Sequence, residues 1–230
     1  MLILFDLDGT LTDPFDGVSR SFAHALESMG LPALSDNAMR GVIGPPLQDS
    51  FAALGLSPTD CARAVELYRL RYAEVGLFEN RVYDGIPEAL QELAADNRTL
   101  AVATSKPTEF AERILEHFDL RQHFALVSGA SMDGERRHKA DIVRHALAAL
   151  AAPAKQAVLV GDRAQDAIGA AQSGVGFVGA RWGYAEPGEL EAAGATLFAA
   201  APDDLPPTIT GSVTGVPFVD RSVNGQYPLG

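Results

Sequence analysis

Two aspartates separated by one residue are the first feature of this sequence that indicates chemistry. Asp6 and Asp8 follow a short apolar run, residues 2–5, and precede a glycine. Side chains alternate along a strand, so both carboxylates would lie on the same face. Like charges this close repel unless a cation or a shared proton lies between them. The pattern predicts a site that holds a divalent metal ion and uses one aspartate as a nucleophile.

A second pair of aspartates follows another apolar segment. Residues 158–160 lead into Gly161-Asp162, and Asp166 comes four residues after Asp162. If Asp166 lies in the first turn of a helix, both carboxylates can face the same side, as metal ligands and the groups that orient them. The alternative is that Asp162 only caps that helix.

A hydroxyl and a lysine complete the set of polar side chains. Thr104 and Ser105 end an apolar run before Pro107, where a helix begins, so a hydroxyl and backbone N–H groups can donate to a phosphate oxygen. Ser105 is equally suited to cap that helix, and we expect Lys106 to be solvated. Lys139 begins an apolar-periodic helix, where its charge opposes the helix dipole. This misfit indicates a paired or ligand-binding lysine, and an exposed basic run is the alternative.

The elements that carry these residues alternate in the manner of an α/β protein. Helical patterns separate the later strands, which predicts a Rossmann-like parallel sheet covered on both faces. Polar residues at the carboxyl ends of such strands lie at the edge where ligands bind. The expected strands are residues 2–5, 100–104, 125–128, 157–160 and 175–178.

A long stretch between the first and second strands contains only helical patterns. Asp13 with Pro14 at the first helical position predicts a helix that ends at Gly30. Another begins at Ser57-Pro58 and has an apolar stripe at helical spacing. The members of this stripe are Cys61, Val65, Tyr68, Tyr72 and Val75.

An all-helical insertion of this length predicts a second domain inserted into the first. We expect a core of residues 1–14 and 84–200 and a helical cap of residues 15–83, with hinges near residues 12–15 and 81–85. Residues 201–230 are rich in Pro, Gly, Thr and Val without a helical period, so we expect an irregular C-terminal tail.

Composition and charge restrict the class of partner. The 230 residues are 47% hydrophobic and 21% charged, as in a globular protein, and the net charge is −12. That charge argues against nucleic acid or an anionic membrane as the partner. No apolar stretch is long enough to span a bilayer, and the N-terminus lacks a signal-peptide pattern. The single cysteine excludes an intramolecular disulfide, and we expect a cytoplasmic protein of unspecified oligomeric state.

The order and spacing of these residues resemble the haloacid dehalogenase superfamily of phosphotransferases, over about residues 1–200. DxDGT at Asp6–Thr10 is typical of its phosphatase branch, and the helical insertion is similar to the small cap of its first class. Within the superfamily the chain is most similar to the phosphoglycolate-phosphatase-like group, although Ser105 stands where many of those relatives have asparagine. The other matching positions are Thr104, Lys139 and GDxxxD at Gly161–Asp166.

This resemblance implies a Mg²⁺-dependent phosphatase for a small phosphorylated metabolite, either 2-phosphoglycolate or a nucleoside 5′-monophosphate. It implies that Asp6 forms an aspartyl-phosphate and that Asp8 acts as general acid and then as general base. In the cap, Arg40 and residues 43–47 are candidates for binding the leaving group. The implied phosphate-binding residues are Thr104, Ser105, Lys139 and Gly9, and the implied metal site comprises Asp6, Asp8 through its backbone carbonyl, Asp162 and, as the orienting residue, Asp166.

Three other functions are open. A phosphomutase of the β-phosphoglucomutase type would return the phosphoryl group to a sugar rather than to water. A protein phosphotransferase ranks lower, because the sequence lacks a kinase's glycine-rich loop and catalytic loop. A non-enzymatic binding protein ranks last, because every catalytic position of the family is filled.

Overall fold

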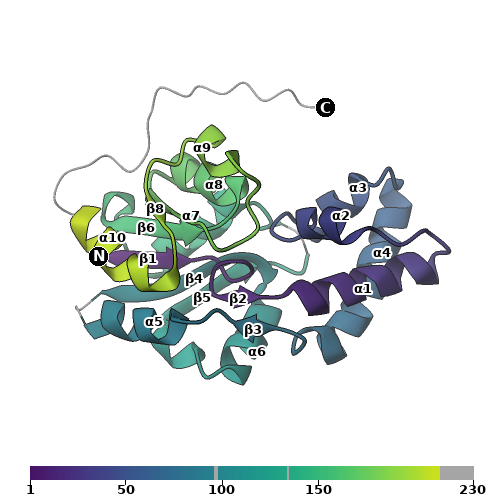
Figure 1. The fold of residues 1–230 in the computed structure, drawn as a ribbon, viewed down its shortest axis with the longest axis horizontal. Helices are drawn as coiled ribbons and strands as arrows, with labels where there is room; N and C mark the ends of the chain where they lie inside the picture. The colour runs from purple at the N-terminus through teal and green to yellow at the C-terminus, as the bar shows by residue number, and fades with distance from the viewer. Residues whose placement is uncertain (96–97, 134, 213–230) are drawn as a thin grey trace.

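A parallel sheet forms the centre of the molecule. The computed structural model describes residues 1–95, 98–133 and 135–212. Within these residues the main sheet has six strands in the order β5-β4-β1-β6-β7-β8 (Figure 1). All five predicted strands are confirmed, and β8 is an addition at the edge. The strands are β1 (Leu2–Phe5), β4 (Thr99–Pro107), β5 (Leu126–Ala130), β6 (Ala157–Gly161), β7 (Gly176–Ala180) and β8 (Phe198–Ala199).

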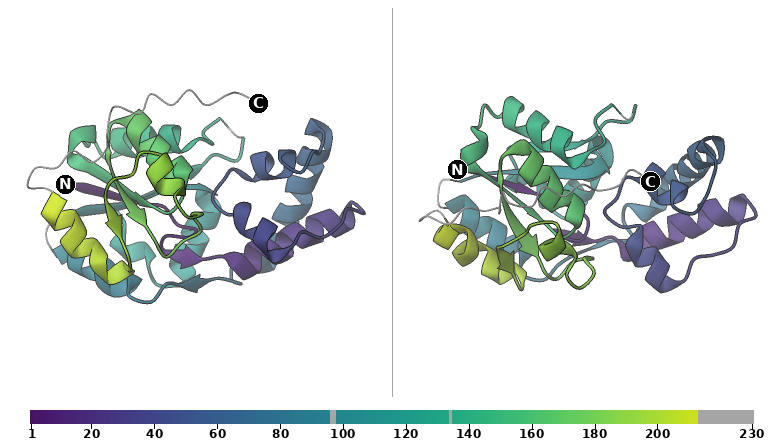
Figure 2. Two further views of the ribbon diagram at one scale, coloured as in Figure 1. Left: turned by 45° about the horizontal axis from the view of Figure 1, so that its top comes forward. Right: turned by 90° about the horizontal axis from the view of Figure 1, so that it is seen from above.

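Helices cover both faces of this sheet, as the alternation of elements predicts. Ile3 and Phe5 of β1 face the apolar cluster that includes α5 (Ile86–Ala95) and α6 (Thr108–His117). The neighbouring side chains of β1 face the cluster that includes α7 (Lys139–Ala149) and α8 (Ala164–Ser173), on the other side of the sheet (Figures 1 and 2). A strand buried on both faces is apolar throughout, which is why residues 2–5 form an unbroken apolar run.

The cap extends from one end of the sheet (Figure 2). Its centre is apolar: Phe22 and Phe51 are fully buried, and their rings stack 4.1 Å apart. These cap side chains belong to the same apolar cluster as those of β1, so the interior of the cap is continuous with that of the core. It consists of α1 (Phe15–Ser28), α2 (Asp36–Gly41), α3 (Leu47–Ala52), α4 (Pro58–Arg71) and the π-helix η1 (Tyr72–Gly76).

The end of the long cap helix differs from its predicted stripe. Ser57 caps α4 as expected, accepting a hydrogen bond from the Asp60 N–H at 3.2 Å. Tyr72 is buried, but Val75 is 47% exposed, so its assignment to the apolar stripe is wrong. The reason is the π-helix η1, in which each turn takes more residues than in an α-helix and the following side chains rotate away from the stripe.

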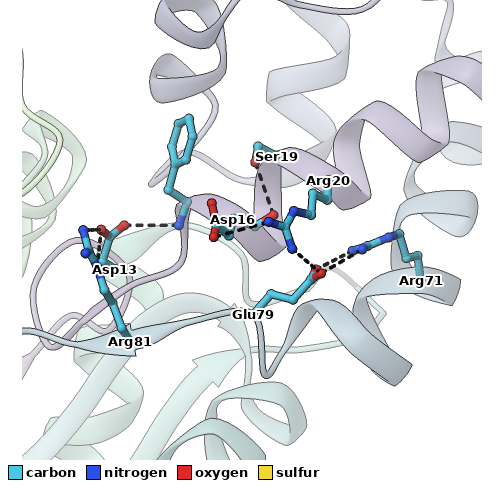
Figure 3. Close-up of polar contacts among 8 residues, drawn as sticks. Asp13, Asp16, Ser19, Arg20, Arg71, Glu79 and Arg81 are labelled. Carbon is cyan, nitrogen blue, oxygen red and sulfur yellow. Dashed lines mark hydrogen bonds and ion pairs between the residues drawn. The ribbon is translucent and has the colours of Figure 1, made fainter.

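The two connections between core and cap run side by side as a short antiparallel pair. Here β2 (Thr12–Asp13) pairs with β3 (Arg81–Val82). The Asp13 carboxylate accepts hydrogen bonds from Arg81 at 3.0 and 2.5 Å (Figure 3). These strands lie where the sequence places the hinges; the domain boundaries themselves remain a proposal.

A second ion-pair group joins the cap helices beside this pair. The Glu79 carboxylate accepts from Arg20 of α1 at 2.7 Å and from Arg71 of α4 at 2.7 and 3.1 Å (Figure 3). It therefore links both long cap helices to the segment that returns to the core.

The expectation of an irregular tail from residue 201 is wrong for its first part. Residues 202–212 form the short helix η4 (Pro202–Asp204) and α10 (Leu205–Ser212), which packs against α5. Leu205 and Ile209 are four residues apart, on the same side of α10, and both are fully buried. The prolines of α10 lie in its first turn, where no helical N–H bond is lost. The remainder of the expected tail lies outside the described residues.

Three short helices complete the described elements, and none of the helices in the described ranges is long and apolar enough to cross a bilayer. The short helices are η2 (Arg121–His123), η3 (Ala154–Gln156) and α9 (Glu189–Ala192).

Candidate active site

Three neighbouring strands bring the predicted polar residues to one edge of the sheet. β1 lies between β4 and β6, with Phe5 opposite both Val102 and Val160. Asp6 directly follows β1, Thr104 lies near the end of β4, and Asp162 directly follows β6. Because the strands are parallel, these residues meet at the carboxyl edge.

Three carboxylates form a buried acidic cluster at this edge. Asp6, Asp162 and Asp166 are at most 3% exposed, and one oxygen of each lies within 4.8 Å of the others. Asp166 lies in the first turn of α8, as expected. Its carboxylate accepts a hydrogen bond from the N–H of Arg163, the N-cap residue, at 3.0 Å. The interpretation of Asp162 as the cap is therefore wrong.

Lys139 carries the positive charge of this cluster. Its Nζ lies 2.9 Å from Asp6 Oδ1 and 2.7 Å from Asp166 Oδ1, and it donates to the Ala103 carbonyl at 3.0 Å. Burial opposes the charge, but the carboxylates of Asp166 and Asp6 outweigh it and raise the pKa of Lys139. The lysine is thus paired within the site rather than part of an exposed basic run.

A second lysine pairs with Asp8, which corrects the expectation that Lys106 is solvated. Lys106 is 8% exposed, and its Nζ lies 2.7 Å from Asp8 Oδ2 and donates to the Tyr72 hydroxyl. The irregularity of β4 between Thr104 and Pro107 interrupts the regular alternation of side chains there. Burial is the main influence on Asp8 and raises its pKa, although Lys106 acts in the opposite direction.

Asp162 is held in place by neighbours on two loops. Its carboxylate accepts hydrogen bonds from Thr10 Oγ1 at 3.0 Å and from the Tyr184 N–H at 2.8 Å. Gly9 has φ +84°, and a Cβ there would lie 2.2 Å from Asp162 Oδ2. Only glycine permits this approach. The Gly9 N–H donates to the Thr12 carbonyl at 2.7 Å, within the loop, and the phosphate contact of Gly9 stays a prediction.

The acidic cluster suits a divalent cation such as Mg²⁺. Asp6 Oδ1 and Asp8 Oδ1 are buried atoms for which the described residues supply no hydrogen bond, Asp6 Oδ1 having only its ion pair with Lys139. Burial, followed by the charges of Asp166 and Asp6, raises the pKa of Asp162 well above its usual value. A cation among the oxygens of Asp6, Asp162 and Asp166 would give the Asp6 oxygen that lacks a hydrogen bond a second partner and would stabilise the charged form of Asp162. Carboxylate oxygen is the ligand that Mg²⁺ prefers. The Asp8 carboxylate lies outside this group of three, paired with Lys106.

A cavity of about 320 Å³ lies between the core and the cap. Its polar lining from the core comprises Asp6, Asp8, Thr104 and Ser105. Three cationic side chains from the core and the cap also line it: Lys106, Arg137 and Arg69. The other walls are mainly apolar and aromatic. They include Val18, Val42, Ile43, Gly44, Pro45, Pro46, Leu47, Val65, Tyr68, Tyr72 and Phe110.

The two cap candidates have different outcomes. All of residues 43–47 line the cavity, as expected. Arg40 does not line it: the side chain is exposed, and its guanidinium lies over the rings of Phe15 at 5.3 Å and Tyr184 at 5.9 Å. The structure therefore does not bring Arg40 to the phosphate-binding residues.

A family model described as haloacid dehalogenase-like hydrolase matches residues 3–180. The chain belongs to this family. The resemblance inferred from the motifs is thereby confirmed, and the six-stranded sheet with its helical cap is the fold of this haloacid dehalogenase-like hydrolase.

Individual relatives are similar to this haloacid dehalogenase-like hydrolase in sequence and in structure. The chain is 42% identical over 191 residues to a 5′-nucleotidase of Pseudomonas aeruginosa, covering 83% of this chain and 86% of the relative. A crystal structure of a predicted phosphatase from Clostridium acetobutylicum has a TM-score of 0.88 at 36% identity, covering 91% and 98% of the two chains. The structure of protein tyrosine kinase A from Mycobacterium tuberculosis has a TM-score of 0.80 at 40% identity, covering 90% and 97%.

Besides Lys106, sequence reasoning missed Tyr72, Arg69 and Arg163 as side chains beside the site of this haloacid dehalogenase-like hydrolase. Tyr72 has the same spacing as the apolar residues of its helix, and nothing local distinguishes its hydroxyl. Arg69 reaches the cavity only through the packing of cap against core. Arg163 lies between Asp162 and Asp166, so its place in the motif was the one available signal.

Proposed function

We propose that this hydrolase removes phosphate from a small metabolite in a Mg²⁺-dependent reaction that passes through an aspartyl-phosphate on Asp6. The family and its named relatives make the chain a phosphoric monoester hydrolase. The observation that supports the finer proposal is the buried group of Asp6, Asp162, Asp166 and Lys139, with the separate pair of Asp8 and Lys106 beside it.

Asp6 is the nucleophile in this proposal. One of its oxygens attacks phosphorus, and the bond from phosphorus to the leaving oxygen breaks. Lys139 holds the Asp6 carboxylate at 2.9 Å, and in this proposal it offsets the charge of Asp6. Thr104, 1% exposed on the cavity wall, donates its hydroxyl to a phosphoryl oxygen. Fixed donors of this kind stabilise the charge that spreads over the phosphoryl group.

Asp8 is the proton carrier. It protonates the leaving oxygen in the first step and takes a proton from the attacking water in the second. Burial raises the pKa of Asp8 and favours the protonated form that the first step needs, while Lys106 favours the carboxylate that the second step needs. Two opposing influences on one carboxyl suit a group that must serve in both forms.

Asp6, Asp162 and Asp166 are the residues that would hold the metal ion. Mg²⁺ would supply positive charge for the phosphoryl oxygens and for the acidic cluster. The Thr10 and Tyr184 hydrogen bonds keep Asp162 in place for this task.

We propose a nucleoside 5′-monophosphate as the preferred substrate class. The cavity is larger than a two-carbon acid needs, and its aromatic walls, Tyr68, Tyr72 and Phe110, suit a flat ring system. The name of the 42% identical 5′-nucleotidase supports the same class. 2-Phosphoglycolate would leave the part of the cavity beside these aromatic walls unfilled.

The test is phosphate release from nucleoside 5′-monophosphates and 2-phosphoglycolate, with Mg²⁺, with a chelator, and with Asp6→Asn. We expect Mg²⁺-dependent release that favours the nucleotides and falls by at least about 1000-fold in the variant. Release unaffected by Asp6→Asn would refute the aspartyl-phosphate.

Product analysis separates the alternatives. Phosphate returned to a sugar would identify a mutase, and transfer to tyrosine would parallel the name of the Mycobacterium relative.

A further inference from the structure

We propose that Arg163 is a positioning residue that fixes the cap loop, residues 42–46, over the active site and so determines which leaving groups are accepted. The cap loop joins α2 to α3, and residues 43–46 line the cavity. Arg163 belongs to the core, directly after Asp162. The part of this inference that concerns leaving groups rests on the proposed function; the part that concerns the loop does not.

The guanidinium of Arg163 joins core and cap by two hydrogen bonds. Its Nη1 donates to the backbone carbonyl of Ile43 in the cap loop. Its Nε donates to Glu189 Oε1 of α9 at 2.8 Å. A planar guanidinium has donors in fixed directions, so this side chain can bind a carbonyl and a carboxylate at the same time.

Glu189 is itself fixed, so the guanidinium has a firm support in the core. One carboxylate oxygen also accepts from the Ala164 N–H at 2.8 Å, and the other accepts from the Glu186 N–H at 3.0 Å. The side chains of Arg163 and Glu189 are only 11% and 16% exposed, so water and salt screen their pairing less than that of a surface pair. Arg163 thus ties the cap loop to α9 of the core.

The cap loop is shaped to receive Arg163. Gly44 has φ +105°, a conformation that favours glycine, and a Cβ there would lie 2.7 Å from Cγ of Arg163. The carbonyl that Arg163 binds belongs to Ile43, which is 2% exposed and packs in the apolar cluster of the cap and core. Contact between the arginine stem and the loop backbone therefore accompanies the hydrogen bond.

A neighbouring ion pair provides a matched control. Arg181 pairs with Glu191 of the same helix, α9, at 2.6 Å, but both side chains are 45% exposed. Its guanidinium lies over the Phe198 ring of the core at 3.9 Å. Replacing Arg181 therefore changes a charge and an α9 contact without touching the cap loop.

The first experiment is amide hydrogen exchange of the full chain without substrate, comparing wild type with Arg163→Met, Arg163→Lys and Arg181→Met. The probes are the Val42 and Ile43 amides, which donate to the carbonyls of Met39 and Arg40, respectively, at the end of α2. We expect these amides to exchange about tenfold faster in Arg163→Met, the usual consequence of losing one charge-assisted hydrogen bond. In Arg163→Lys the exchange rate of these amides should lie between those of wild type and Arg163→Met. The lysine ammonium can bind either the Ile43 carbonyl or Glu189, but it lacks the planar donors that bind both.

The internal reference is the Cys61 amide at the start of α4, which should exchange at the wild-type rate. Wild-type exchange of the cap loop in Arg163→Met would overturn the proposal. So would an equal increase in Arg181→Met, or an equal increase at Cys61, because each would indicate general destabilisation rather than a fixed loop.

The second experiment compares a nucleoside 5′-monophosphate with methyl phosphate, whose leaving group is too small to reach the cap loop. In Arg163→Met we expect KM for the nucleotide to rise about tenfold, while kcat/KM for methyl phosphate stays within about twofold of wild type. An equal loss on both esters would show that Arg163 acts through the acidic cluster and would refute the specificity role. If the wild type hydrolyses neither ester, the proposed function fails, and the exchange experiment still decides whether Arg163 fixes the loop.

Discussion

Replacing Tyr72 by phenylalanine tests whether the cap contributes to catalysis through a single hydroxyl. That hydroxyl accepts a hydrogen bond from Lys106, and the same Nζ lies 2.7 Å from Asp8 Oδ2. The Lys106 and Asp8 side chains are 5% and 16% exposed and Tyr72 is 2% exposed, so solvent replaces the lost partner poorly. A hydrogen bond to a charged group contributes about 1.5–3 kcal/mol, which corresponds to a loss of about 10- to 100-fold in kcat/KM.

The substitution leaves the packing of the aromatic ring at position 72 intact. The phenyl ring keeps the stack on Tyr68, at 5.1 Å, and the contact with Phe110, at 5.8 Å. We therefore expect the free energy of unfolding to fall by no more than that one hydrogen bond contributes, about 1.5–3 kcal/mol, with no further loss of packing. The assay is phosphate release from the best ester at saturating Mg²⁺, with thermal unfolding measured alongside.

Tyr68→Phe is the matched control for this prediction. Tyr68 is also buried, also lines the cavity and also lies in the stack, but within the described ranges no hydrogen bond of its hydroxyl to Lys106 or Asp8 is found. It should retain activity within about threefold of wild type. Wild-type activity in Tyr72→Phe, or an equal loss in both variants, would refute the reasoning that Tyr72 positions Lys106.

Three further predictions concern the cap and its hinge. Hydrogen bonds from Arg71, opposed by burial and aided by Arg20, lower the pKa of Glu79 below its usual 4.5. Glu79→Gln should therefore cost about 1 kcal/mol of unfolding free energy above that pH, and the difference from wild type should vanish as the pH falls through the lowered pKa; a pH-independent difference would contradict this. Phe51→Ala removes a fully buried ring and should cost about 3–5 kcal/mol in chemical denaturation, with a cost under about 1 kcal/mol counting against the cap core described. Arg40→Ala should leave kcat/KM within about twofold of wild type, and a loss of 100-fold would restore its expected role in binding.

Most of the core fold could be predicted from the sequence, because the patterns that indicate its strands are local. The strands of the sheet are short apolar runs, and the motifs at Asp6, Thr104 and Asp162 come where such a run ends. Parallel strands then place Asp6, Thr104 and Asp162 at one edge without further information. Local patterns misled where long-range packing decides the outcome: the π-helix turned Val75 outward, and burial of Leu205 and Ile209 against α5 made a helix from a proline-rich segment.

What the sequence by itself determined is the family and the group of polar residues at one edge of the sheet: the aspartates and the lysine follow from residue types at fixed spacing along parallel strands. Only the tertiary structure decided which cap residues contact that edge of the sheet. Lys106 was expected in solvent and instead joins Asp8 to Tyr72, and Arg163 binds the Ile43 carbonyl 120 residues away. Such contacts depend on the angle at which cap and core pack, and no local spacing encodes that angle. The motifs therefore predict the chemistry, whereas the proposed selection of a leaving group rests on contacts that only the packing of the cap against the core creates.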